Sequence, residues 1–172
     1  ELHVFYGFGN IEKSGDVLPG PTKLTGSQLK AKMAATEGVV YHGRVSKREL
    51  AREMLSAGVW FYPTWFSETS CLSAMEAQAA HLYLVTSPHA ALKETANCYN
   101  CTMLEGNWGS EAFRLNAVTA AVKYFNRPVR QADDASHFSL DTLTDDWELG
   151  LNAMLDRVER DVVPRFCDWT KR

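Results

Sequence analysis

The stretch VWFYPTWFSETSCLSAMEAQAAHLYLVT, residues 59–86, carries most of the information about the fold. It begins and ends with short, nearly continuous apolar runs, VWFYP (59–63) and LYLVT (82–86), which are typical of strands buried on both faces of a parallel sheet. Between them, small and apolar residues recur at helical spacing over about 70–80. The stretch therefore predicts a strand, a helix and a second parallel strand.

The same alternation continues on both sides of this stretch. Further strands are expected at LHVFYG (2–7), VVYHG (39–43) and CTML (101–104). Further helices are expected at about 26–36, at 46–57, in a short piece after Pro88, at 111–125 and at about 142–160. Alternating strands and helices predict an α/β fold, a doubly wound parallel sheet of about five strands with helices on both faces.

Two of the helices carry additional signals. Ser46 and Glu49 form a capping-box pattern ahead of an apolar stripe of Leu50, Met54 and Leu55. The helix at 111–125 is expected to turn the following side chains inward: Phe113, Ala117, Val118, Ala121 and Phe125.

Composition limits the class of protein. The 172 residues are 45% hydrophobic and 23% charged, which is typical of a soluble globular domain. The formal net charge of −3 argues against nucleic acid as the partner, and no apolar run reaches the roughly 20 residues of a membrane span. We expect a single cytoplasmic domain over 1–172, with 139–172 as a C-terminal helical extension, excised from a longer protein.

The familiar cofactor and metal motifs are incomplete. GFGN (7–10) follows a strand, but the dinucleotide-binding pattern requires a glycine at the position of Glu12. CYNC (98–101) is a single Cys-x-x-Cys pair, whereas a zinc site needs two more ligands nearby. We therefore expect neither a cofactor nor a metal.

Two glutamates stand out after the strand at 59–63. Glu68 precedes a helix N-terminus, where free backbone N–H groups and the helix dipole suit a diphosphate. Glu76 lies about two turns into that helix, where accepting hydrogen bonds from vicinal hydroxyls would account for a partly buried acid. Alternatively, Glu76 is a surface acid paired with a neighbour and Glu68 a plain loop acid. The spacing alone leaves both interpretations open.

Several motifs follow one another in an informative order. They are HVFYGFG (3–9), YHGRVSKREL (41–50), FYPT (61–64), the pair Glu68 and Glu76 as Glu-x7-Glu, and LVTSPHAALKE (84–94). Together they resemble the donor-binding half of the GT-B fold retaining glycosyltransferases, in the large glycosyltransferase group 1 (family 4) class. The resemblance covers most of residues 1–125.

The resemblance implies a Rossmann-like domain that binds a nucleoside diphosphate sugar. The complete enzyme would transfer the sugar to an acceptor with retention of configuration and without a metal. The acceptor would bind a second, N-terminal domain that this chain lacks, so the expected partners are the nucleotide sugar and that acceptor domain.

The resemblance also assigns roles to individual residues. Glu76 matches the acid that binds the ribose hydroxyls, and Glu68 matches the catalytic-site acid near the donor sugar. The backbone that holds the sugar and diphosphate is matched by Thr69, Ser70, Cys71 and Leu72. The turn on which the base rests is matched by Arg44 and Val45.

The chain departs from the family pattern in three respects. His81 stands where a glycine is usual, and Tyr83 where a proline is usual. The family also has an additional strand, followed by an Arg and a Lys-Gly segment that hold the diphosphate, ahead of the strand matched by 2–7. That strand would lie centrally, between LHVFYG and VWFYP (59–63). We therefore expect either that these two strands pair directly or that another segment or chain fills the slot.

Loss of the diphosphate-binding cations predicts that the isolated chain transfers no sugar. A non-catalytic module with the same fold, binding a nucleotide or a protein partner, is the alternative. A flavodoxin-like signalling domain would require an acid cluster at strand ends, and none follows VFYG or VVYHG.

Overall fold

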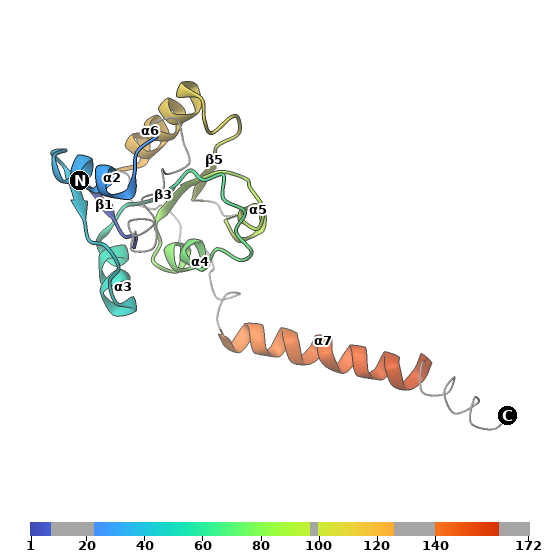
Figure 1. Ribbon diagram of the computed structural model, residues 1–172. Coiled ribbons are helices and arrows are strands. Elements are labelled where there is room, and N and C mark those ends of the chain that lie inside the picture. Colours follow the sequence, from blue (N-terminus) through green and yellow to red (C-terminus); the bar gives the residue numbers. More distant parts are fainter. Residues whose placement is uncertain (8–22, 97–99, 126–139, 162–172) are drawn as a thin grey trace. The chain divides into compact units, whose positions relative to one another are not determined.

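The computed structural model describes residues 1–7, 23–96, 100–125 and 140–161 (Figure 1). The chain divides into two compact units, Glu1–Asp133 and Asp134–Arg172, and each is described by itself. Within the described ranges, no helix combines the length and the apolar character needed to cross a membrane.

The first unit is an α/β structure in which strands and helices alternate. Its strands are β1 (Leu2–Val4), β2 (Val39–Tyr41), β3 (Val59–Tyr62), β4 (Tyr83–Thr86) and β5 (Cys101–Met103). Its helices are α2 (Gly26–Ala34), α3 (Lys47–Ser56), α4 (Leu72–Ala79), α5 (Leu92–Thr95) and α6 (Glu111–Phe125). Each expected element of this unit is present, with ends shifted by a few residues, and the helix at 111–125 has the expected bounds.

The strands form two parallel sheets instead of the single sheet of about five strands that the sequence predicted. β3, β4 and β5 form a three-stranded sheet in that order, and β1 pairs with β2 in a separate two-stranded sheet. In the first sheet, Val85 lies opposite Phe61 on one side and Thr102 on the other. In the second, His3 lies opposite Val40.

Direct pairing of β1 with β3 was one of the two expected outcomes, and it is wrong. β1 hydrogen-bonds to β2 along one edge, and β3 to β4 along one edge. Within the described residues, the other edges of β1 and β3 pair with no strand. Among the described residues, each of these strands therefore has one edge whose backbone groups pair with no other strand. That another segment or chain fills the slot stays a prediction.

The core lies around the three-stranded sheet, and β4 shows why. Successive residues of a strand point to opposite faces, and Leu84 and Val85 are both fully buried. Leu84 packs in one cluster with Ala77 of α4, and Val85 in another with Phe113 of α6. The two helices thus cover opposite faces of this sheet (Figure 1).

The starts of α2 and α3 follow the capping rules. In α3, the Ser46 hydroxyl accepts from the Glu49 N–H at 3.2 Å, and the Glu49 carboxylate accepts from the Ser46 N–H at 3.1 Å. This confirms the capping box. In α2, Thr25 and Gln28 form the same arrangement. The Ser46 N–H and hydroxyl lower the pKa of the Glu49 carboxyl, because both donate to its charged form.

Three of the side chains expected to point inward are exposed. Leu55 of α3 is 72% exposed, and Val118 and Phe125 of α6 are each 53% exposed. In each helix only a narrow strip is buried, at Met54 in α3 and around Ala117 in α6. One residue further along a helix lies about 100° around it, which takes Leu55 and Val118 off these strips.

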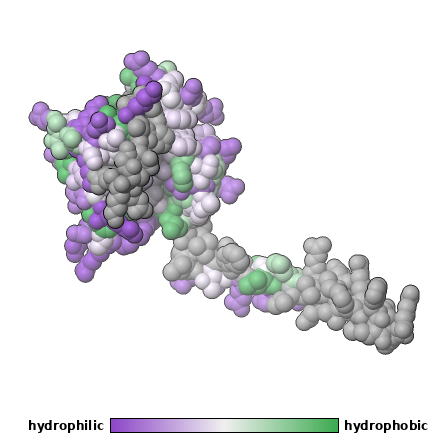
Figure 2. Space-filling model, viewed as in Figure 1, coloured by the Kyte–Doolittle hydropathy of each residue, from purple (hydrophilic) through white to green (hydrophobic). Residues whose placement is uncertain are grey.

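The second unit is described through the helix α7 (Leu140–Asp161), close to the expected bounds of 142–160. Apolar side chains gather along its middle (Figure 2), where Leu149, Leu151 and Met154 are exposed. The first turn carries Asp141, which complements the positive end of the helix dipole.

Candidate functional site

The loop after β3 is anchored at its start by buried polar contacts. Thr64 is buried, and its carbonyl accepts a hydrogen bond from the buried Ser87 hydroxyl, which follows β4. The Thr64 hydroxyl in turn accepts from the Phe66 N–H at 3.0 Å. These bonds fix the path of the chain at the carboxyl ends of β3 and β4. Ligands of parallel α/β sheets bind beyond the carboxyl ends of the strands.

Glu68 is held at the same carboxyl ends of the strands. The Tyr62 hydroxyl donates to Glu68 Oε1 at 2.8 Å, and the Ala91 N–H donates to the Glu68 carbonyl at 3.2 Å. Burial, together with the bond to this carboxylate, raises the pKa of Tyr62 to about 12, so the phenol keeps its proton and remains a donor. Glu68 is therefore a half-buried acid in a fixed position, with Oε1 directed at the end of β3.

The start of α4 lies just after Glu68. The helix begins at Leu72, with Cys71 at the N-cap in an unusual conformation with φ of 21°, and no side chain caps it. Thr69 and Ser70 precede the helix and are exposed, and Leu72 is 64% exposed. Cys71 is the exception among the predicted residues here, because its side chain is buried and burial raises the pKa of its thiol. The N-terminal turn of α4 thus has no side-chain cap, and within it the Ala74 N–H donates to the Cys71 carbonyl at 2.9 Å.

Glu76 is joined to the first residue of α3, Lys47. Lys47 Nζ lies 2.5 Å from Glu76 Oε1, and the Glu76 side chain is 37% exposed. Gly43, with φ of 71°, ends the turn after β2, and Arg44 and Val45 lead from it toward Lys47. The structure thus joins the start of α3, two residues after this turn, to the helix that carries Glu76. The partnered surface acid of the alternative interpretation has the same contact, so this pair alone does not separate the two readings.

A cavity of about 430 Å³ opens at the carboxyl ends of β3, β4 and β5. Its walls include Thr64 and Trp65 after β3, Ser87 after β4, and Leu104 and Trp108 after β5. The indoles of Trp65 and Trp108 are stacked, with ring centroids 5.1 Å apart. None of the predicted site residues lines this cavity, although Thr64 of the motif FYPT (61–64) and Ser87, Pro88, His89 and Lys93 of the motif LVTSPHAALKE (84–94) do.

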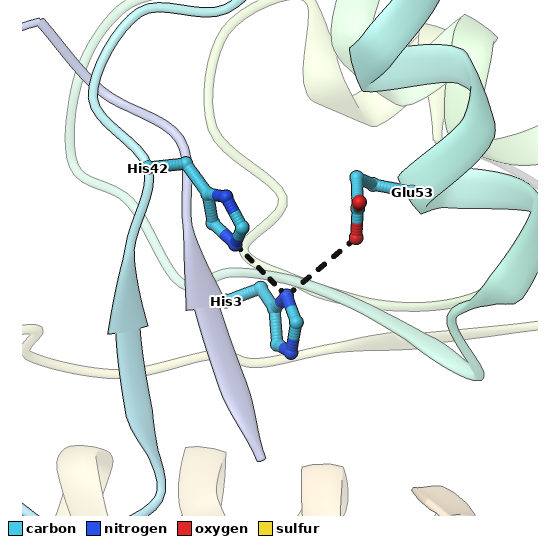
Figure 3. Close-up of side chains that lie close together, drawn as sticks. All are labelled: His3, His42 and Glu53. Carbon is cyan, nitrogen blue, oxygen red and sulfur yellow. Dashed lines mark hydrogen bonds and ion pairs between the residues drawn. The ribbon is translucent and has the colours of Figure 1, made fainter.

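Sequence reasoning missed two features. The stacked indoles belong to loops 43 positions apart in the chain, from Trp65 to Trp108, and no spacing rule connects them. A cluster of His3, His42 and Glu53 joins β1, the turn after β2, and α3 (Figure 3). The two histidines are related through the register of β1 against β2, which the sequence does not reveal.

Comparison of the sequence with models of protein families, and of the chain with curated proteins and solved structures, finds no match. The assignment of this site therefore rests on the motifs and on the contacts described above.

Proposed function

We propose that this chain is the nucleotide-sugar donor-binding part of a retaining, metal-independent glycosyltransferase with a Rossmann-like GT-B fold. The donor is a nucleoside diphosphate sugar. The acceptor binds to a further domain of a longer parent protein.

The proposal is supported by the meeting of two motif segments, because YHGRVSKREL (41–50) and the helix of the Glu-x7-Glu pair are joined through Lys47 and Glu76. Lys47 lies two positions after Val45 and 29 positions before Glu76 in the chain, and its Nζ lies 2.5 Å from Glu76 Oε1. A donor nucleotide must touch both segments at once, with the base on the turn at Arg44 and Val45 and the ribose at Glu76. Their proximity supports that arrangement.

One carboxylate oxygen of Glu76 and one of Glu68 suit the proposed contacts. Lys47 binds Glu76 Oε1, and Tyr62 binds Glu68 Oε1. In each carboxylate, the second oxygen has no hydrogen bond from the described residues and is left to accept one from a hydroxyl. Oε2 of Glu76 would accept from the ribose, and Oε2 of Glu68 from the donor sugar.

The diphosphate would lie at the start of α4. Uncapped N–H groups at a helix N-terminus form an anion site, and the N-terminal turn of α4 has no side-chain cap. As the glycosidic bond to the donor breaks, negative charge grows on the leaving diphosphate. Fixed N–H dipoles aimed at that charge would stabilise the transition state without a metal.

The split sheet supports a separate proposal, that the chain by itself transfers no sugar. The edges of β1 and β3 that pair with no described strand would both be satisfied by one further parallel strand between them, supplied by another segment or chain. Until that strand is in place, the turn after β2 and the edge of β3 are not held in one sheet. The non-catalytic alternative shares this feature, and turnover by the parent protein separates the two.

Calorimetric titration with UDP, GDP and ADP tests the donor site. Glu76→Gln should weaken binding of the preferred nucleotide by about 1.5–3 kcal/mol, because charge-assisted hydrogen bonds to the ribose are lost. Glu94→Gln, which alters an exposed glutamate of α5, is the matched control and should change nothing. The 2′-deoxynucleotide should bind wild type and Glu76→Gln almost alike. Equal affinity of wild type for the ribo and deoxy forms would show that Glu76 does not bind the ribose.

A second variant addresses the sugar. Glu68→Gln should leave the affinity for the plain diphosphate unchanged and lower turnover by the parent protein, because its contact is to the sugar. An equal loss of affinity for the nucleotide and the nucleotide sugar would make Glu68 a structural acid instead.

A further inference from the structure

Three side chains from three separate elements converge outside the proposed donor site (Figure 3). His3 lies on β1, His42 directly follows β2, and Glu53 lies on α3. His3 Nδ1 is 3.0 Å from His42 Nε2 and 3.6 Å from Glu53 Oε2. One nitrogen from each ring and one carboxylate oxygen all lie within 4.8 Å of one another.

The parallel register explains why the histidines meet. His3 lies opposite Val40, and side chains two positions apart on a strand share a face, so His42 is the diagonal neighbour of His3. The backbone N–H of His42 continues the ladder by donating to the Val4 carbonyl at 2.9 Å. The ring of Phe5 stacks on the His42 ring at 4.4 Å and 11°, which fixes the plane of that imidazole.

The converging atoms are those that zinc prefers in proteins. Imidazole nitrogen and carboxylate oxygen bind zinc at about 2.0–2.2 Å, and a tetrahedral site then places neighbouring ligand atoms about 3.3 Å apart. The separations of 3.0 and 3.6 Å lie on either side of this spacing. Two histidines and one glutamate also make up a common three-ligand zinc set that leaves the fourth position to water.

His3 has a contact on each of its ring nitrogens. His3 Nε2 lies 3.4 Å from the Glu1 carboxylate, so Nδ1 is the nitrogen of this ring that lies close to both His42 Nε2 and the Glu53 carboxylate. One ligand atom from each of three elements thus lies within 4.8 Å of the others, and a bound metal ion would contact all three at once.

We propose that His3, His42 and Glu53 bind one divalent zinc ion, with water as the fourth ligand. Glu1 is the outer carboxylate that orients His3, as carboxylates commonly do for zinc-bound histidines. The ion ties the two-stranded sheet to α3, and α3 is anchored in the core of the other sheet through Met54. It therefore fastens the less buried sheet to the more buried part of the same unit.

Titration of the metal-free chain with zinc chloride, followed by calorimetry and by thermal unfolding, tests the proposal. Wild type should bind one equivalent and unfold at a higher temperature with zinc, because an ion that binds the folded state stabilises it. His42→Asn should lose the site, with affinity falling more than the roughly 10–100-fold that loss of an outer partner costs. His81→Asn removes an exposed histidine elsewhere and is the matched control, so it should bind zinc as wild type does.

Cobalt(II) substitution identifies the ligands spectroscopically. The proposed nitrogen and oxygen ligands should give visible bands of a four-coordinate ion without the intense near-ultraviolet band of a cobalt–thiolate bond. Glu53→Gln keeps the shape of the side chain and should weaken or abolish these bands, while Glu1→Gln should weaken binding by about 10-fold and keep the bands. A thiolate band, equal loss in His42→Asn and His81→Asn, or unchanged binding in both His42→Asn and Glu53→Gln would overturn the proposal.

Discussion

The two sheets of the first unit are built from parallel strands of three or four residues, yet their surroundings differ. In the three-stranded sheet, β4 has three consecutive buried residues, Leu84, Val85 and Thr86, because helices cover both faces. In the two-stranded sheet, Leu2 is 47% exposed and Val40 is 36% exposed. Apolar strand sequences thus pair in both places, and the helices packed on them decide which sheet becomes the core.

The two sheets also differ in the kind of contact that holds them. The core sheet is held by side chains such as Leu84 and Phe113 that exclude water. The two-stranded sheet has polar attachments, including the His3 contact with Glu53 and a hydrogen bond from the Tyr41 hydroxyl to the Tyr6 carbonyl at 2.8 Å. Hydrophobic burial contributes most to stability, so the global free energy of unfolding should depend mainly on the core sheet.

The largest expected effect comes from shortening a side chain in each sheet. Leu84→Ala should lower the free energy of unfolding by about 2–5 kcal/mol, because it leaves a cavity in a fully buried site. Val40→Ala, at a partly exposed site in β2, should lower it by less than about 1 kcal/mol. Urea denaturation followed by circular dichroism measures both. Equal losses would mean that the two sheets contribute alike to the free energy of unfolding, contrary to this expectation.

An intermediate effect is expected at two glutamines. Gln78 is buried, and its Nε2 donates to the Thr95 carbonyl at 2.5 Å and to the Ala74 carbonyl at 3.1 Å, which links α4 to the segment at α5. Gln78→Ala should cost about 1–3 kcal/mol, because buried carbonyls lose their donor. Gln28→Ala, which removes an exposed capping contact to Thr25 in α2, should cost about half as much or less. The same urea titration checks the order, and a larger loss for Gln28→Ala would reverse it.

The smallest expected effect is a pH dependence of stability, and it should differ between α3 and α2. The capping box of α3 uses Glu49, whose pKa is lowered in the folded state, whereas that of α2 uses Gln28, which does not titrate. A lowered folded pKa gives stability that is present above the ordinary glutamate pKa and is lost as the pH falls through the folded value. The difference in urea midpoint between wild type and Glu49→Gln should therefore be present at pH 7 and shrink toward pH 3. A difference that stays constant with pH would assign it to packing.

Local rules predicted the elements well. The capping box at Ser46 and Glu49 predicted the start of α3, and the apolar run at 59–63 predicted β3 to within one residue, because both signals act over a few residues. The buried positions Phe113 and Ala117 followed from helical spacing. These features depend on neighbours in the chain, which the sequence displays directly.

Features that depend on contacts between distant segments were not predictable in the same way. The division into two sheets depends on which strand edges meet, and the apolar runs at β1 and β3 are compatible with either pairing. The exposure of Val118 depends on how α6 is rotated against the sheet. The meeting of His3 with His42 depends on the register of β1 against β2, since a shift of one residue would place them on opposite faces.

The stacked indoles at the cavity have an optical consequence. Trp65 and Trp108 lie with ring centroids 5.1 Å apart and planes inclined by 24°, close enough for their electronic transitions to couple. Such a pair gives a two-signed band in the ultraviolet circular dichroism spectrum, and the band vanishes when the rings separate. Both indoles line the cavity beyond β3 and β5, so a molecule that enters between the two loops would change this band. The chain thus contains an intrinsic spectroscopic probe at the end of its core sheet.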